Sequence, residues 1–529
     1  MNYPFWQLPG IGGGLLIAII AVLHVYIAHL AVGGGLFLVW TERKARQEGR
    51  EDLLAYVKKH TRFFLLLTMV FGGVSGVGIW FIISLVHPGG TSLLIHNFVF
   101  GWAIEWTFFI GEIVALLIYH YLFDRLRPAV HLAMGWLYFA FAWLSLFIIN
   151  GILSYMLTPG GWLETGDFWQ GFFNPTFWPS LLFRTGMACS IAGIFGLVTA
   201  SFARGGEPGR GLLRYNALWM LLPLAAVILG GFWYLGALPA DTAENLRRLN
   251  PEALPFTKVF LGATALVFLG GLISLVRLPR GAQRAATVLI LAIGLAWIGG
   301  FEYLREIARK PWVIHGHLYS NSVRPEQLDG LNREGFLAAA KWVQNREINE
   351  ENRLAAGREL LVHQCLICHS LGGYNDLVEH TAELTGYGLL AQLRGQGRVN
   401  PYMPPFFGTD AEAEALAATI SLELQGRESD GLDPYLDHPR CVAMGEIGFN
   451  HITPNEEKAF VRQLEIAAAR DIPVIVMTGS AIVDDASRQR VLALGATCFM
   501  SKPFSVEDLI EEIETVLWEG GRHEGDDVG

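Results

Sequence analysis

The stretch Ile11–Trp40, IGGGLLIAIIAVLHVYIAHLAVGGGLFLVW, contains no Asp, Glu, Lys or Arg. An α-helix needs about 20 consecutive apolar residues to cross the hydrocarbon core of a bilayer, so this stretch is long enough to span one. Seven similar runs follow, and together they predict transmembrane helices at 11–40, 62–86, 96–122, 131–157, 181–203, 213–236, 257–276 and 285–306. We therefore predict an all-α integral membrane fold that begins with an eight-helix transmembrane bundle.

The composition divides the chain into a membrane half and a water-soluble half. The 529 residues are 52% hydrophobic and only 17% charged, as in multi-pass membrane proteins. The apolar runs end near residue 306, and most of the formal net charge of -10 comes from the residues after them. Lipid is thus an expected partner. No basic patch with interleaved aromatic residues occurs, so no nucleic-acid partner is expected.

Basic residues in alternate loops predict the orientation of the bundle. They follow the first, third, fifth and seventh predicted helices, as Arg43, Arg125, Arg210 and Arg280 illustrate. By the positive-inside rule these four loops face the cytoplasm. The sequence thus predicts a multi-pass protein of the bacterial cytoplasmic membrane, with its N-terminus and the residues after 306 on the periplasmic side. No cleavable signal peptide is expected, because the first apolar run lacks a basic leader.

The segment Cys365-Leu366-Ile367-Cys368-His369 has the spacing of a c-type haem attachment motif. In such a motif two thiols form thioether bonds to one haem, and the histidine becomes an axial iron ligand. A redox-active dithiol or half of a zinc site are the alternatives, but no second cysteine pair lies nearby. We expect one covalent haem c, on the periplasmic side where the predicted topology also puts the motif.

A methionine downstream of this motif is the expected second axial ligand. The segment Tyr402-Met403-Pro404-Pro405-Phe406 resembles the Met-Pro-Pro loop of class I cytochrome c domains, and a helical segment follows it. The alternatives are His380 or His363 as the ligand, with Met403 an ordinary core or surface residue. We predict a small α-helical cytochrome c domain at 346–427, joined to the membrane domain 1–311 by a linker at 312–345.

Titratable side chains inside the predicted spans are candidates for function, because such groups are costly at membrane depth unless they are paired, ligating or hydrated. Glu105 and Glu112 are seven residues apart on one helix, so they share a face and could line a polar path. His24 is a candidate iron ligand, with Gly33-Gly34-Gly35 nearby to permit a close helix approach. His29 lies on the same helix, and Glu302, Arg305 and Glu306 end the eighth. A purely structural role for the two histidines is the alternative.

Several of these residues stand in motifs that resemble subunit I of the cytochrome bd oxygen reductase superfamily. The motifs are His24 followed by Glu42, Gly101-Trp102-Ala103-Ile104-Glu105, Glu112 followed by Asp124-Arg125-Leu126, and Glu306 followed by Arg309-Lys310-Pro311-Trp312. The resemblance implies that His24 and Glu306 are ligands of two non-covalent b- or d-type haems. It also implies that Glu105 and Glu112 serve the haem pocket and proton delivery, and that a second membrane subunit, of the subunit II kind, is a partner.

The chain also departs from that family in three places. No histidine follows Asn174-Pro175 where the family places a low-spin haem ligand, and Phe183-Arg184-Thr185 stands there instead. The methionine expected near 256–259 is missing, and the loop at 238–255 is too short for the family's quinol-binding loop. These departures resemble the cytochrome c-carrying branch of the superfamily, which implies loss of the quinol site and a periplasmic electron donor such as a cytochrome c.

The last hundred residues predict an incomplete α/β tail. Residues 428–475 resemble a fragment of a TatD-type hydrolase, with Glu446 at one metal-ligand position, and residues 476–529 resemble a response-regulator receiver, with Thr478 and Lys502 at its switch positions. The other ligands and the phospho-accepting aspartate of these families are absent from the sequence. We expect neither activity, and interpret the tail as a fusion remnant or a chimeric join.

These features lead to three hypotheses. The first is a membrane haem oxidoreductase that passes electrons from a periplasmic donor through haem c to membrane haems, where oxygen is reduced. The second is a non-catalytic electron-transfer cytochrome subunit of a larger respiratory complex. The third is a membrane anchor for the cytochrome domain.

Overall fold

The computed structural model describes residues 5–203, 209–276, 278–430, 432, 475–478, 489 and 498–501. The chain forms two compact units, Met1–Asp430 and Gly431–Gly529. In the second unit the described residues include two short parallel strands, β3 (Ile475–Thr478) and β4 (Cys498–Ser501), with Ile475 paired to Cys498. Glu446 and Lys502 lie outside the described residues.

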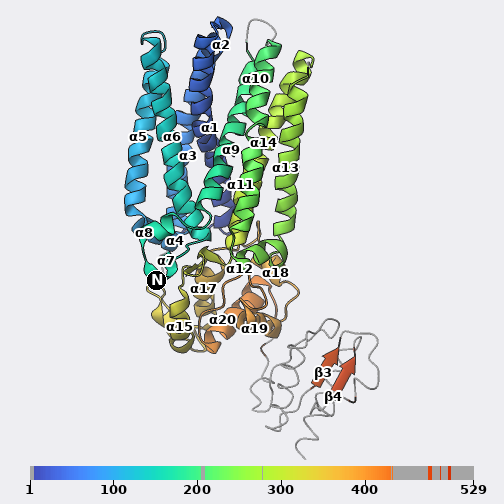
Figure 1. The fold of residues 1–529 in the computed structure, drawn as a ribbon. Helices are drawn as coiled ribbons and strands as arrows, with labels where there is room; N and C mark the ends of the chain where they lie inside the picture. Colours follow the sequence, from blue (N-terminus) through green and yellow to red (C-terminus); the bar gives the residue numbers. More distant parts are fainter. Residues whose placement is uncertain are drawn as a thin grey trace, which may run out of the picture. The chain divides into compact units, whose positions relative to one another are not determined.

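Among the described residues of the first unit, eight helical segments are long and apolar enough to cross a membrane, which confirms the predicted all-α integral membrane bundle (Figure 1). They are Gly13–Gln47 (α1), Glu51–Val86 (α2, η1 and α3), Val99–Tyr121 (α5), Pro128–Leu157 (α6), Phe177–Ser201 (α9), Arg210–Gly236 (α10 and α11), Ala253–Ser274 (α13) and Arg280–Arg309 (α14). Within the second segment, α2 (Glu51–Leu65) and α3 (Gly73–Val86) are joined by a π-helical turn, η1 (Leu66–Gly72). In the sixth, α10 (Arg210–Leu221) gives way to α11 (Leu224–Gly236) at Pro223.

Several helices extend beyond the ends that the apolar runs predict. The first continues to Gln47, and the second begins at Glu51 rather than at residue 62. In α2 the side chains of Leu53 and Val57 are buried, whereas Lys58 on the other face is exposed. Hydropathy marks only the part of a helix that lies in hydrocarbon, so amphipathic helix ends outside it are missed.

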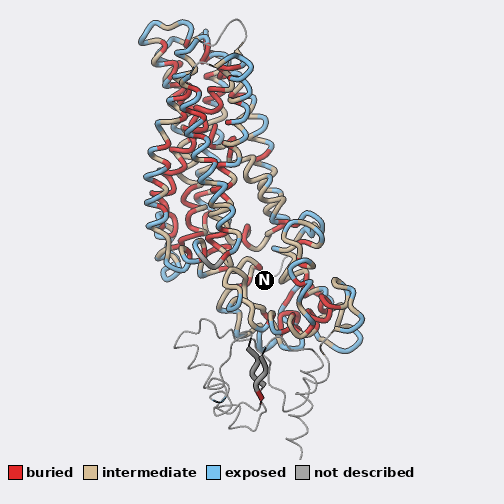
Figure 2. Tube along the Cα trace, turned by 90° about the vertical axis from the view of Figure 1, so that its right-hand side faces the viewer, coloured by how far each residue is buried: buried red, intermediate tan, exposed pale blue. Residues whose placement is uncertain are grey.

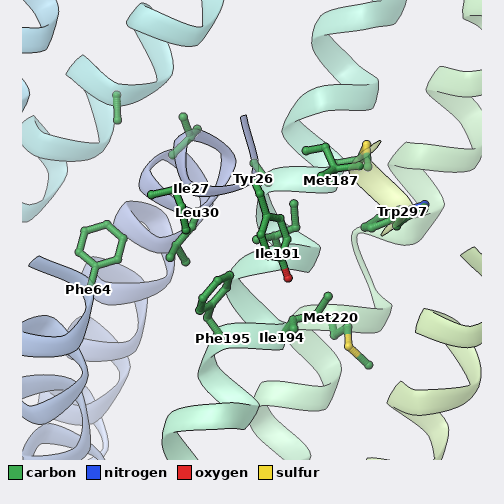
Figure 3. Packing of buried hydrophobic residues seen from close by; sticks show 14 of the residues in the cluster. Tyr26, Ile27, Leu30, Phe64, Met187, Ile191, Ile194, Phe195, Met220 and Trp297 are labelled. Carbon is green, nitrogen blue, oxygen red and sulfur yellow. The ribbon is translucent and has the colours of Figure 1, made fainter. Parts of the chain in front are cut away.

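The core of the bundle is built around α9, because 83% of the residues in its most apolar stretch are buried. Buried residues run through the interior of the bundle (Figure 2). Glycine lets α1 approach α9 closely, because a Cβ on Gly33 would lie 1.9 Å from the carbonyl oxygen of Ala188. Around this crossing Tyr26, Ile191 and Phe195 pack together with other buried apolar residues (Figure 3). Side chains on α1 and α9 therefore occupy the interior of the bundle.

Short elements connect the spans. They are α4 (Pro88–Asn97), α7 (Trp162–Thr165), α8 (Phe168–Phe172), α12 (Ala240–Glu244) and η2 (Asn245–Leu249). After α14 the chain forms a two-stranded antiparallel hairpin of β1 (Trp312–Ile314) and β2 (Leu318–Tyr319). The hairpin is joined to the bundle, because the backbone N–H of His315 donates to Met156 O at 3.0 Å. The segment expected to be a linker thus contains regular structure.

The small helical domain follows this hairpin. Its elements are η3 (Pro325–Gln327), α15 (Leu328–Glu334), α16 (Phe336–Ala339), α17 (Arg353–Leu360), η4 (Leu361–Cys365), α18 (Leu377–Thr381), α19 (Gly386–Gly395), α20 (Asp410–Thr419) and η5 (Ile420–Leu424). Buried Glu412 joins two of them: it forms a capping box with Thr409 at the start of α20, and its carboxylate accepts the backbone N–H groups of Phe336 and Leu337 at 2.9 and 2.7 Å.

Candidate functional site

The imidazole of His24 is held in one tautomer inside the bundle. Ser75 on α3 donates its only hydroxyl hydrogen to Phe71 O at 2.7 Å, so its oxygen accepts a hydrogen bond from His24 Nδ1 at 3.1 Å. This arrangement leaves the lone pair of Nε2 free. A neutral imidazole whose other nitrogen donates to a fixed acceptor is the form that binds iron, so His24 fits the ligand role that the sequence suggests.

Glu105 and Glu112 both face α6, as their spacing predicts. Ser145 donates a hydrogen bond to Glu105 at 2.8 Å, and the Tyr138 hydroxyl donates to Glu112 at 3.0 Å. The same Tyr138 oxygen lies 3.1 Å from Ala31 O on α1. The two carboxylates therefore lie along one helix interface and have hydroxyl groups as neighbours, although their part in proton delivery stays a prediction.

Glu306 lies in the last turn of α14. Its carboxylate is paired with the guanidinium of Arg309, which also donates to Val313 O at 2.9 Å. The Glu306 side chain keeps 42% of its surface accessible, whereas that of Arg309 keeps only 9%. Arg309 thus fixes Glu306 at the end of the eighth span and leaves part of the carboxylate open to a ligand.

The cysteine motif forms a tight turn at the end of η4. The backbone N–H groups of Cys368 and His369 donate to Cys365 O at 3.1 and 2.9 Å, and the two cysteines are not joined by a disulfide bond. His369 Nδ1 lies 3.3 Å from Asn375 O, which can only accept, so Nε2 is the free nitrogen. Burial raises the pKa of Cys365 to about 12 and lowers that of His369 to about 4. The motif therefore offers two thiols and a neutral imidazole at neutral pH.

The loop that contains Met403 is tied to this motif. The side-chain amide of Gln364 donates to Phe407 O at 2.6 Å and accepts from Phe407 N at 3.1 Å. Phe407 is fully buried, so the loop has a fixed anchor beside the motif. Of the two rival ligands, His380 has its Nε2 3.0 Å from the side-chain oxygen of Asn375, and His363 packs its ring against Phe336.

The cysteine motif lies near the end of the membrane span that contains Glu306. The Cys368 thiol interacts with the Ser320 side chain, and Glu306 and Lys310 lie within electrostatic range of it. Nearby, the hydroxyl groups of Tyr303 on α14 and Tyr374 are hydrogen-bonded to each other, and Tyr303 also donates to Glu252 at 2.6 Å. The two expected haem-binding regions are therefore neighbours.

Comparison with known proteins finds a match for the first part of the bundle. Residues 15–245 match the family described as cytochrome bd terminal oxidase subunit I. No curated protein matches the chain. Among solved structures, that of the bd oxidase from Geobacillus thermodenitrificans is similar over 58% of this chain and 90% of its own, with 17% sequence identity and a TM-score of 0.49.

The matched residues contain only part of the candidate site. His24, Glu105 and Glu112 lie inside the match, whereas Glu306 and the cysteine motif lie beyond its end at residue 245. The membrane part through that residue is thus similar to cytochrome bd subunit I. The role of Glu306 rests on its own motif and geometry.

Arg184, which stands where the resemblance expects a histidine, takes part in a buried ion pair. Its Nη1 lies 2.8 Å from the carboxylate of Glu302, and Arg305 donates to the same carboxylate at 3.0 Å. The Arg184 side chain is only 2% exposed. A charged network therefore occupies this part of the bundle interior, and the sequence had suggested neither the pairing nor its burial.

Sequence reasoning also missed two buried histidines. His131 lies 2.8 Å from the carboxylate of fully buried Glu42, and Tyr119 donates to that carboxylate at 2.7 Å. His60 lies 2.8 Å from the hydroxyl of Thr199. Both histidines stand at the ends of apolar runs, where a titratable residue looks like a loop residue, so only their contacts with other helices identify them as buried.

Proposed function

We propose that this chain is a haem-carrying membrane subunit of a respiratory oxidoreductase. In this proposal a periplasmic donor such as a cytochrome c delivers electrons to haem c, which passes them to membrane haems held by His24 and Glu306. Oxygen is the proposed acceptor. The family match of residues 15–245 supports the membrane part of this function, and the cysteine motif supports the covalent haem.

The observation that carries the proposal is the proximity of the cysteine motif to the end of α14, where Tyr303 is hydrogen-bonded to Tyr374 from the segment that follows the motif. Cys368 interacts with Ser320, and Glu306 lies within electrostatic range of the thiol. Electron transfer between cofactors needs them to be close, and this contact brings the covalent attachment site next to a candidate membrane ligand. The haem c domain is thus an electron donor to the bundle rather than an unrelated appendage.

The residues present fit haem as the bound group. His24 and His369 each offer a free Nε2, because the Nδ1 of each ring is engaged with Ser75 or with Asn375. Glu306 adds a partly accessible carboxylate. When bound, the haems supply one-electron transfer and the activation of oxygen. The protein supplies ligands, fixes their orientation and excludes water from the bundle interior.

The carboxylates of Glu105 and Glu112 are the proposed proton carriers. Each has a hydroxyl neighbour on α6, Ser145 for the first and Tyr138 for the second. A carboxylate beside a hydroxyl can take up a proton and release it along the helix interface. Both therefore act by holding and transferring protons, and neither is proposed as an iron ligand.

We further propose a second membrane subunit of the cytochrome bd subunit II kind as a partner, and a donor other than quinol. Outward-facing apolar side chains such as Phe100, Trp106 and Phe232 give the bundle a surface that fits lipid or another membrane protein. Arg184 with its buried ion pair supports the loss of the low-spin haem and with it of quinol oxidation. The basic loops support a periplasmic position for the N-terminus and the haem c domain.

Haem extraction combined with oxygen uptake tests the proposal on the purified protein. We expect one covalent haem and two extractable haems, with cyanide-sensitive oxygen uptake when a reduced soluble cytochrome c is the donor. Glu306→Ala should lose an extractable haem and the uptake, whereas Glu164→Ala, at an exposed glutamate of α7, should keep both. The absence of extractable haem would leave only the anchor hypothesis, and reducible haems without oxygen uptake would favour the electron-transfer subunit.

A further inference from the structure

The bundle interior contains a group of buried polar side chains with unused hydrogen-bonding atoms, which we call the Arg184 cluster. It consists of His29 on α1, Arg184 on α9, Tyr234 on α11, and Glu302 and Arg305 on α14. Among the described residues no hydrogen-bond partner exists for Arg184 Nε and Nη2, Arg305 Nη1, Tyr234 OH, His29 Nε2 or Glu302 Oε1, although this last atom lies 2.8 Å from Arg184 Nη1 in an ion pair.

These atoms gather at one place rather than being scattered through the bundle. Arg184 and Arg305 share the carboxylate of Glu302, at 2.8 and 3.0 Å. His29 lies close enough to Arg184 and Glu302 to interact with their charges. Tyr234 lies close enough to interact with both arginines. Four helices therefore direct polar groups to a shared interior volume.

Unused donors in such a place indicate a ligand. Leaving a buried donor without a partner costs about 1–3 kcal/mol, more for a charged group, and the hydrocarbon around the bundle offers no acceptor. The cluster has two guanidinium groups and one carboxylate, so its charges leave one positive charge in excess. A ligand that satisfies it is expected to carry a negative charge.

The geometry of Arg184 points to a carboxylate. Its Nη1 is used by Glu302, so the free atoms Nε and Nη2 form one complete edge of the guanidinium. That edge presents two parallel N–H groups, which match the two oxygens of a carboxylate. The same side chain lies over the ring of Phe301 at 5.1 Å, and Phe301 packs against Phe183 at 4.5 Å. The surroundings of the charged edge are thus apolar and aromatic.

We propose that the Arg184 cluster binds a propionate carboxylate of a membrane haem, with Arg184 as the bidentate donor and Arg305 and Tyr234 as further donors. A large apolar molecule that carries carboxylate arms suits aromatic surroundings with one excess positive charge. This inference rests on the proposed function, which places haem near His24 and Glu306. It assigns Arg184 a role of its own, where the sequence indicated only that an iron ligand is missing.

Isotope labelling of the haem tests this inference without measuring activity. Cells that produce the intact protein are fed 5-aminolevulinic acid with 13C in its carboxyl group, which labels the haem propionates, and infrared difference spectra are recorded between the oxidised and reduced protein. We expect label-sensitive carboxylate bands of the membrane haems to shift in Arg184→Met, and to a smaller extent in Arg184→Lys. Arg284→Met is the control, since Arg284 bonds Ser201 O at the opposite end of α14. The propionates of haem c serve as an internal reference.

Redox titration gives a second measurement. The haem potentials would not change if Arg184 and Glu302 formed only a structural ion pair. Arg184→Met should lower the midpoint potential of a membrane haem, because a positive charge beside its propionate is lost, and Glu302→Gln should raise it. Haem c should keep its potential in both variants.

Label-sensitive bands that are identical in the wild type and in both Arg184 variants would overturn the inference and leave the proposed function standing. Carboxylate bands that shift in the Arg184 variants but not with the 13C label would show that the cluster binds a carboxylate outside the haem. That result would also overturn the inference. Absence of extractable haem would overturn both proposals.

Discussion

Gln364 and Phe407 are joined by two hydrogen bonds, from Gln364 Nε2 to Phe407 O at 2.6 Å and from Phe407 N to Gln364 Oε1 at 3.1 Å. Gln364 directly precedes Cys365, and Phe407 ends the loop that contains Met403. The pair therefore closes the loop of the expected distal ligand onto the turn of the expected proximal ligand. Phe407 is fully buried, so the Gln364 amide has no ready replacement by solvent.

Replacing Gln364 by leucine should weaken the attachment of the Met403 loop. Two hydrogen bonds to buried backbone groups are lost, which costs about 1–3 kcal/mol in the free energy of unfolding. We expect a lower thermal midpoint and loss of the visible absorption band that a methionine sulfur gives to ferric haem c. Gln344→Leu, at an exposed glutamine, is the control. An unchanged methionine band in Gln364→Leu would show that the loop is held by other contacts.

His87 makes the contact between the membrane bundle and the hairpin sensitive to pH. Its Nε2 donates to Ser320 O at 2.7 Å, and its Nδ1 accepts from Gly90 N at 3.2 Å, so the ring is neutral in the fold. Burial lowers the pKa of His87 below its ordinary value of 6.5, and the charge of Arg309 lowers it further. The unfolded chain therefore binds a proton more readily, and the stability from this ring is present above pH 6.5 and is lost as the pH falls below it.

Thermal unfolding of the detergent-solubilised protein between about pH 7 and pH 5 measures this effect. We expect His87→Asn to lose less stability than the wild type over that interval, because asparagine does not titrate. His96→Asn, at an exposed histidine of α4, should follow the wild type. Parallel curves for the wild type and His87→Asn would exclude His87 as the group responsible.

Glu42 is expected to be essential for stability at the far end of α1. Its fully buried carboxylate accepts hydrogen bonds from Tyr119 and Arg46, both at 2.7 Å, and lies 2.8 Å from His131. Glu42→Leu leaves these buried groups without their partner and should cost about 3–5 kcal/mol. Glu48→Leu breaks only a surface pair with Lys44 and should cost at most about 1 kcal/mol. The thermal midpoint of each variant measures the difference, and equal midpoints would contradict it.

The eight spans could be predicted from the sequence because each is encoded by a local apolar run such as Ile11–Trp40. The Cys365–His369 motif is local as well. Contacts between helices are not local, so the partners of Glu42 and Arg184 could not be predicted: His131 and Glu302 lie far from them in the chain and show no common pattern. The side-chain tautomers that favour His24 and His369 as ligands likewise depend on Ser75 and Asn375, which no motif marks.

Tyr374 is expected to set the rate of electron transfer between haem c and the bundle. Its hydroxyl is hydrogen-bonded to Tyr303 on α14 and lies 3.4 Å from Glu252, to which Tyr303 also donates at 2.6 Å. Tyr374→Phe removes the shared hydroxyl at a cost of about 1 kcal/mol, which corresponds to a factor of about five in the equilibrium constant between the closely packed and the separated forms.

Because electron transfer slows steeply with distance, reduction of the membrane haems after rapid reduction of haem c should slow in Tyr374→Phe, by at most that factor. The midpoint potential of haem c should not change, since the axial ligands are retained. Stopped-flow absorption at the bands of the two haem types measures both steps. Tyr121→Phe, at an exposed tyrosine that ends α5, should behave as the wild type. A changed haem c potential in Tyr374→Phe would show that the hydroxyl acts on the haem site itself, and an unchanged rate would show that the Tyr303–Tyr374 contact does not hold the two regions together.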